Sequence, residues 1–116
     1  MKPHDEVRLR HMLEAARTAA GFVQGQTRSD LATDRMLAFA LVRAIGIIGE
    51  AACKVTGETR ASCPEVPWPA LVAMRNRLIH ACFDIDLDRV WDTVADDLPP
   101  LVAQLEQALA RAAPPG

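Results

Sequence analysis

The stretch "MLAFALVRAIGIIGEAAC", which spans Met36–Cys53, decides the fold of this chain. It has the length of a long helix and is apolar almost all round, with only Arg43 and Glu50 charged. A soluble helix of this kind must be covered on most sides, by its own bundle, by another chain, or by both. The sequence therefore predicts a central helix that begins after Asp34, which can cap it, and ends before Gly57.

Helical spacing predicts one segment before this central helix. It runs from about Asp5 to Gln24, with an apolar stripe along one side and Gly25 just beyond its end. After the central helix, "GETRASCPEVPWP" reads as a connection, because it holds three prolines and leaves room for one short helical turn.

Proline and aspartate mark the remaining helices. Pro69 fits the first turn of a third helix, which should run to about Phe83. Asp86 can cap a fourth, and Pro99-Pro100 should break it before a last helix closes the chain. No stretch alternates as a strand does, so we predict an all-α antiparallel bundle of four to five helices.

The composition agrees with this interpretation. The 116 residues suffice for one domain, 1–116, in which we expect a disordered tail at about 112–116. Half of the chain is hydrophobic, but only five residues are aromatic and none is tyrosine, which favours helices over a sheet. No apolar run reaches the roughly 18 residues that span a membrane, and the first residues are charged, so we expect a cytoplasmic protein.

Cysteine usage and charge exclude several classes of function. Cys53, Cys63 and Cys82 form no CxxC pair, so neither a disulfide framework nor a metal site is expected. The net charge is −2, with nine basic and seven acidic residues in 1–60 against four and eight in 61–116. This balance argues against a broad basic face for long nucleic acid, so any phosphate contact must be local. We expect no cofactor.

Arg75 is the unusual residue of the third helix. On a helical wheel it lies inside an apolar arc, while Asn76 and His80 share the opposite face. A buried arginine needs an anion, and the candidate is Glu50, the acidic residue within the almost wholly apolar central helix. In the structural interpretation, a pair of Arg75 and Glu50 merely locks two helices together.

In the functional interpretation, the guanidinium binds a phosphate and the imidazole transfers a proton. This combination could cleave a phosphodiester without a metal, using the 2′-hydroxyl of RNA as the nucleophile. Cleavage works best with both a base and an acid, but His4 and His11 have no matching phosphate partner in the sequence. Two copies of His80 across a two-fold axis would supply both, which predicts a homodimer.

The stretch "MRNRLIHACFDIDLDRVWDTVADDLP", Met74–Pro99, resembles the signature of HepT-like proteins in the HEPN superfamily. That signature is an arginine, a polar residue, three or four others, a histidine, one more residue and a tyrosine. "AIGIIGEAACKVTGE" and "CPEVPWPALVAMRN" are also similar to the family, so the resemblance covers about Val7–Leu109. It implies a dimeric four- to five-helix bundle and a metal-independent endoribonuclease toxin. The usual partner is a minimal nucleotidyltransferase antitoxin, MntA, which attaches AMP to the motif tyrosine.

The resemblance implies a role for each matching residue. Arg75 becomes the residue that binds phosphate and stabilises the transition state, Asn76 orients the site, and His80 is the catalytic imidazole. Glu50 supports Arg75. Apart from the resemblance, the charges of Arg75 and Arg77 from both copies can draw phosphate to a ribonuclease site. Cys82 stands where the modified tyrosine should be, which puts regulation by AMPylation in doubt.

Two alternatives stay open at this point. In the first alternative, the chain is a non-catalytic HEPN binding module that partners a nucleotidyltransferase. The missing tyrosine is an argument for this alternative. Alternatively, Cys82 is a redox control point, although its place in the apolar arc argues against a reactive thiol.

Overall fold

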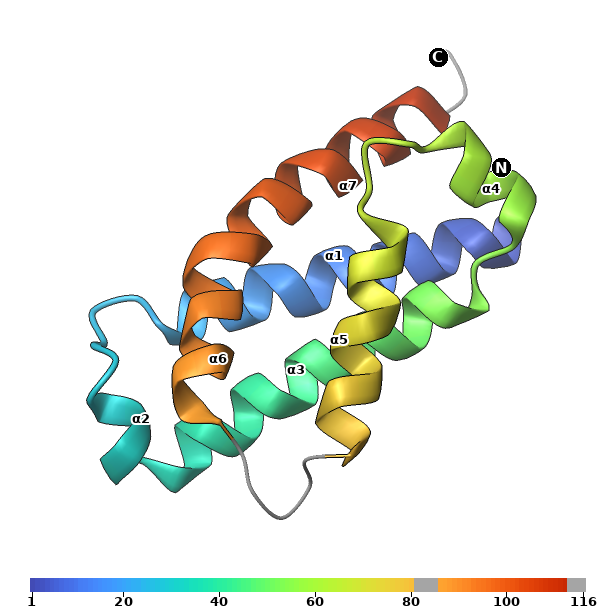
Figure 1. The fold of residues 1–116 in the computed structure, drawn as a ribbon. Coiled ribbons are helices and arrows are strands. Elements are labelled where there is room, and N and C mark those ends of the chain that lie inside the picture. The colour runs from blue at the N-terminus through green and yellow to red at the C-terminus, as the bar shows by residue number, and fades with distance from the viewer. Residues whose placement is uncertain (81–85, 113–116) are drawn as a thin grey trace.

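The structure is a computed structural model that describes residues 1–80 and 86–112, with only the backbone for 78–80. Every regular element in these ranges is helical, so the predicted all-α bundle is confirmed (Figure 1). The elements are α1 (Pro3–Phe22), α2 (Asp30–Thr33), α3 (Arg35–Lys54), α4 (Gly57–Ser62), α5 (Trp68–His80), α6 (Leu87–Asp92), the π-helix η1 (Thr93–Asp97) and α7 (Leu98–Ala112).

The predicted central helix is α3, which packs against α1 on one side and α5 on another. Figure 1 shows α5 lying across α3, while α7 runs along α1. The core consists of small and branched apolar side chains from these helices, including Leu9, Met12, Leu41, Ile45, Ile48, Leu101 and Leu105. One face of α3 stays open within this single chain, because Met36 is 83% exposed and Phe39 is 54% exposed. The bundle therefore covers α3 on only part of its surface.

Short polar side chains fix where the helices begin. The carboxylate of Asp34 accepts a hydrogen bond from the backbone N–H of Leu37 at 3.0 Å, as predicted for the start of α3. Asp86 accepts one from the N–H of Arg89 at 3.1 Å and caps α6. Gly25 follows α1 with a φ of 75°, a conformation that favours glycine.

A buried carboxylate ties the start of α1 to the start of α4. Asp5 is fully buried and accepts hydrogen bonds from the Thr56 N–H at 3.1 Å, from the Thr56 hydroxyl at 2.6 Å and from the Thr59 hydroxyl at 2.6 Å. Burial alone would raise the pKa of Asp5, but these hydrogen bonds outweigh it and lower the pKa to about 2. The first helix is thereby anchored to the connection that leads to α5.

The prediction that Pro99-Pro100 breaks the fourth helix is wrong. The helical backbone runs from α6 through η1 into α7, and both prolines lie in the first turn of α7. A proline there costs little, because the hydrogen bond that it removes belongs to a turn already widened by the π-helix. The short turn predicted in the connection is present as α4, while α2 was not predicted.

The apolar length of α3 differs from the sequence prediction, and two predicted ends lie wholly or partly outside the described residues. Among the described residues, α3 is the one helix long and apolar enough to cross a membrane. The count of uninterrupted apolar runs missed it because Arg43 and Glu50 interrupt the stretch. Phe83, the predicted end of the third helix, lies outside the described residues, as do residues 113–116 of the predicted tail; Ala112 belongs to α7.

Candidate active site

The site is built where α5 approaches α3 at Gly49. A Cβ atom placed on Gly49 would lie 2.3 Å from Cβ of Arg75 and 3.2 Å from its Cα. No side chain fits in that space, so only glycine lets α5 come this close. Sequence reasoning missed Gly49, although a glycine inside a helix, next to a charged residue, was an available signal.

Arg75 of α5 forms the predicted pair with Glu50, the residue that follows Gly49 on α3. The Nε of Arg75 donates to Oε1 of Glu50 at 2.8 Å, and Nη1 donates to the side-chain oxygen of Asn76 at 3.3 Å. The Arg75 side chain is 32% exposed and that of Glu50 is 47% exposed. The arginine is therefore not enclosed by apolar residues, although its place inside the apolar arc of the wheel suggested that it would be. Its neighbour Met74 points into the core instead.

The charges at this site stabilise one another. The hydrogen bond and charge of Arg75 lower the pKa of Glu50, and Lys54 and Arg43 on the same helix lower it further. Glu50 in turn raises the pKa of Arg75. Both groups are charged at neutral pH, so the pair holds a permanent guanidinium at the surface.

The N–H groups of Arg75 that have no acceptor decide whether the guanidinium can bind an anion. Glu50 occupies Nε and Asn76 accepts a hydrogen bond from Nη1, while no described side chain accepts one from Nη2. A guanidinium can bind two oxygens of a phosphate through parallel N–H groups. The arrangement suits an anion that approaches from solvent.

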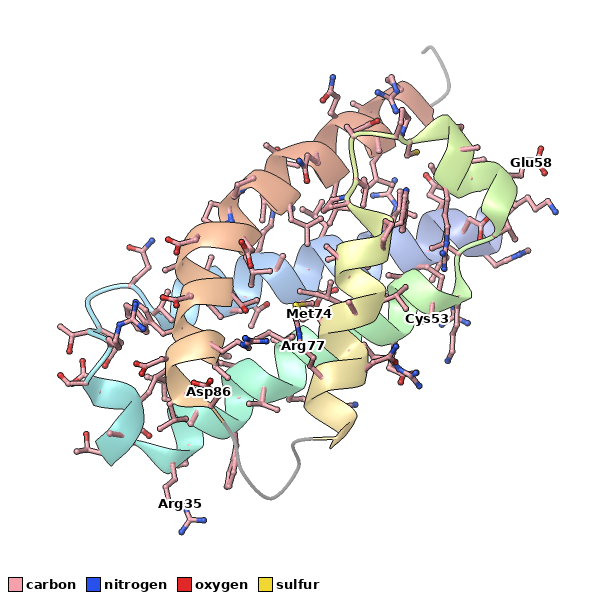
Figure 2. The ribbon with its side chains drawn as sticks, viewed as in Figure 1. Arg35, Cys53, Glu58, Met74, Arg77 and Asp86 are labelled. Atoms are coloured by element: carbon pink, nitrogen blue, oxygen red, sulfur yellow. The ribbon has the colours of Figure 1, made fainter. Side chains whose placement is uncertain are left out.

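The other predicted site residues are less well gathered within one chain. Asn76 is exposed and contacts Arg75. Arg77 is also exposed on α5 (Figure 2). Two residues along a helix correspond to about 200°, so Arg77 leaves α5 on a different side from Arg75. His80 is the last residue of α5, about 7.5 Å along the helix axis from Arg75, and its side chain lies outside the described residues. Cys82 also lies outside them.

None of the remaining histidines and cysteines in the described residues forms a hydrogen bond with this pair. His4 and His11 are exposed on α1. Cys63 is buried, while the exposed Cys53 lies on α3, three residues after Glu50. Within residues 1–80 and 86–112 no three His, Cys, Asp or Glu side chains come together as a metal site would require.

Comparisons with known proteins agree on one family. A family model described as "Ribonuclease HepT-like" matches residues 12–108. A Thermococcus cleftensis protein named "Probable ribonuclease HepT" is 34% identical over 107 residues, covering 92% of this chain and 97% of that protein. A Methanocaldococcus jannaschii protein, provisionally named an RNase, is 34% identical over 95 residues, or 82% and 87% of the two chains. A third relative, from Caldanaerobacter subterraneus and provisionally named an RNase, is 32% identical, covering 89% and 92%. No solved structure matches the chain.

This chain belongs to the HepT-like ribonuclease family of the HEPN superfamily, because the family match covers most of its length. The matched range includes α3 and α5 entirely, and with them Gly49, Glu50 and Arg75. The resemblance seen in Met74–Pro99 is thereby confirmed at the level of the family.

Proposed function

We propose that this chain is a metal-independent endoribonuclease and the toxin of a HEPN/MNT toxin–antitoxin pair. One observation carries the proposal: beside Gly49, Glu50 holds the partly exposed Arg75 guanidinium through Nε, and no described side chain accepts a hydrogen bond from its Nη2. Family membership adds the substrate, since the relatives are named as ribonucleases.

The reaction begins when the 2′-hydroxyl of RNA attacks the adjacent phosphorus. Its proton passes to one His80 imidazole, and the departing 5′-oxygen takes a proton from a second imidazole. The products are a 2′,3′-cyclic phosphate and a 5′-hydroxyl, so atoms and charges balance without a metal. Arg75 binds the phosphate oxygens and stabilises the extra negative charge of the five-coordinate transition state.

Two imidazoles at one phosphate require two copies of the chain. We therefore propose a homodimer with the site at its interface, where Arg75 and His80 of both copies meet. The side chains of Met36 and Phe39 on α3 are apolar and exposed, and a second copy of the chain could cover them, which supports the proposed homodimer. Asn76 positions the guanidinium through its hydrogen bond, and Arg77 adds positive charge.

Cleavage of RNA in the presence of EDTA tests this function. The wild-type protein should leave 2′,3′-cyclic phosphate ends, and Arg75→Ala and His80→Ala should each lose at least a hundredfold in rate. Arg89→Ala is a matched control, because Arg89 is an exposed arginine on α6, whereas Arg75 and Glu50 belong to α5 and α3. Unchanged cleavage by His80→Ala would refute the role of that histidine.

The partner in this proposal is a cytoplasmic MntA-type nucleotidyltransferase antitoxin. Cys82 replaces the family tyrosine, and a thiol is a poor acceptor for AMP, so neutralisation must use another route. The same missing tyrosine favours a second candidate, a non-catalytic module that binds the nucleotidyltransferase. Expression of the chain alone separates the two, because a toxin arrests growth and a binding module does not.

A further inference from the structure

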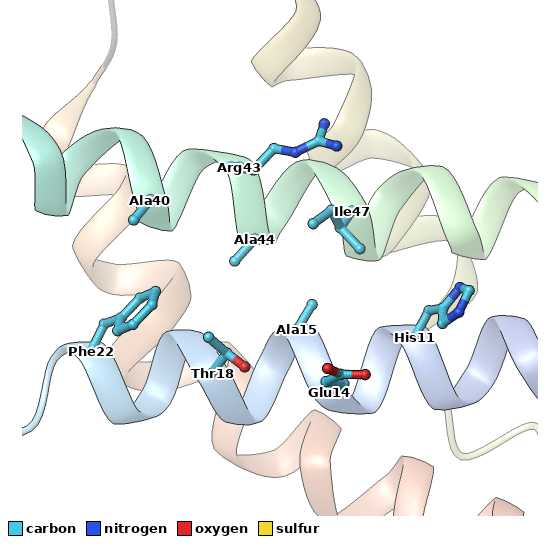
Figure 3. Close-up of a pocket in the computed structure, with 9 residues that line it drawn as sticks. All are labelled: His11, Glu14, Ala15, Thr18, Phe22, Ala40, Arg43, Ala44 and Ile47. Atoms are coloured by element: carbon cyan, nitrogen blue, oxygen red, sulfur yellow. The ribbon is translucent and has the colours of Figure 1, made fainter.

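A groove of about 420 Å³ runs between α1 and α3 (Figure 3). Alanines form its floor: Ala15 comes from α1, and Ala40 and Ala44 come from α3. Because these side chains are single methyl groups, the two helices leave a space that larger residues would fill. The groove is thus encoded by small residues on two facing helices.

Aromatic and polar groups surround this apolar floor. Phe22 stands at one end, 46% exposed, and Arg43 and His11 lie at its edges. Glu14 and Thr18 line the α1 side, and neither Glu14 nor Arg43 forms an ion pair with another described residue. An apolar hollow with a few convergent polar groups is typical of sites for small planar ligands.

Arg43, which lines the groove, lies on the side of α3 that also carries Glu50. Arg43 and Glu50 are seven residues apart, which places them on the same side of the helix and about 10 Å apart along its axis. The charge of Arg43 also contributes to the lowered pKa of Glu50. A stacked strand covers that length with about three nucleotides, at ~3.4 Å for each.

We propose that this groove binds a nucleobase of the RNA substrate near the scissile phosphate, and that Arg43 binds the phosphate between them. This inference rests on the proposed ribonuclease function. Single-stranded RNA is recognised by bases that stack on aromatic rings or guanidinium planes and form hydrogen bonds along their edges. Phe22, His11 and Arg43 offer such planes.

Glu14 gives the groove a preference among bases. Its carboxylate can only accept hydrogen bonds, so it suits the exocyclic amino group of adenine, cytosine or guanine. Uracil has no exocyclic amino group, and the one donor on its base-pairing edge, N3–H, is flanked by two carbonyl oxygens that would repel the carboxylate. The groove therefore selects amino-bearing bases over uracil at this position.

Binding of short fluorescent oligoribonucleotides, measured by anisotropy, tests the inference. The protein is the full chain with His80→Ala, so that RNA stays intact. Ala40→Leu fills the half-buried groove and should weaken binding about tenfold, the scale of one stacked base. Ala103→Leu, at an exposed position of α7, should leave binding unchanged. Arg43→Ala should weaken binding more than Arg89→Ala, although both remove one positive charge.

The base preference gives a second measurement. Glu14→Ala should remove most of the difference in affinity between oligo(A) and oligo(U). Equal binding by Ala40→Leu and Ala103→Leu would overturn the inference, and so would a change of Ala40→Leu from dimer to monomer, since a second copy would then occupy the groove. Loss of RNA binding in Ala40→Leu alongside an inactive wild type would uphold the groove and refute the proposed function. Normal cleavage by the wild type with normal binding by Ala40→Leu would uphold the proposed ribonuclease function and refute the role of the groove.

Discussion

Replacement of Gly49 by alanine is a sharp test of how α5 holds Arg75 in place. The new Cβ would lie 2.3 Å from Cβ of Arg75, whereas ordinary contacts between such atoms are 3.4–4 Å. The helix α5 must therefore move by about 1 Å, and overpacking of this kind costs about 1–3 kcal/mol. Alanine regains roughly 1 kcal/mol of helix propensity, so we expect a net loss of up to about 2 kcal/mol.

Gly46 offers a matched control one turn earlier on the same helix. A Cβ there meets nothing within 4 Å, so Gly46→Ala should stabilise the protein by roughly 0.5–1 kcal/mol through propensity alone. Urea unfolding at one protein concentration, followed by circular dichroism, measures both variants. Gly49→Ala should also slow RNA cleavage about tenfold or more, because a 1 Å displacement moves the guanidinium. Equal stability and equal cleavage for the two variants would refute the proposed close approach.

The pair and the buried carboxylate give further predictions. Glu50→Gln should slow RNA cleavage about tenfold but change the free energy of unfolding by less than about 1 kcal/mol, since the pair is half-exposed; Glu58→Gln, at an 82% exposed side chain, is its control, and equal rates would contradict a supporting role for Glu50. Asp5→Asn should cost about 2 kcal/mol in urea unfolding at pH 7 through weakened hydrogen bonds to Thr56 and Thr59. Because the pKa of Asp5 is lowered from 3.8 to about 2, its stabilisation is complete above about pH 5 and is lost progressively as the pH falls below 3.8 and through about 2. A wild type and an Asp5→Asn variant with parallel stability curves from pH 5 to pH 2 would contradict this.

Much of the fold follows from local signals in the sequence. The apolar stretch of α3, the aspartate caps and the proline at the start of α5 each act through neighbouring residues, so they could be predicted. Pro99-Pro100 misled the prediction because the effect of a proline depends on whether it falls in the first turn of a helix.

The site was predictable only in part, for the same reason. Arg75 and Glu50 could be paired because a charge on an apolar arc needs a partner. The contact of Gly49 with Arg75 and the groove floored by Ala15, Ala40 and Ala44 depend on how two helices cross. No spacing within a single helix contains that information.

The fork of the Arg75 guanidinium, held by Glu50 through Nε, binds the scissile phosphate in the proposed reaction. The most direct measurement is the single-turnover rate of RNA cleavage in EDTA for the wild type and for Arg75→Lys. Lysine keeps the positive charge but can neither hold Glu50 through Nε nor present two parallel N–H groups. We predict a rate at least a hundredfold lower for Arg75→Lys, with 2′,3′-cyclic phosphate ends on the wild-type products. A variant that cleaves RNA as fast as the wild type would contradict this role of Arg75.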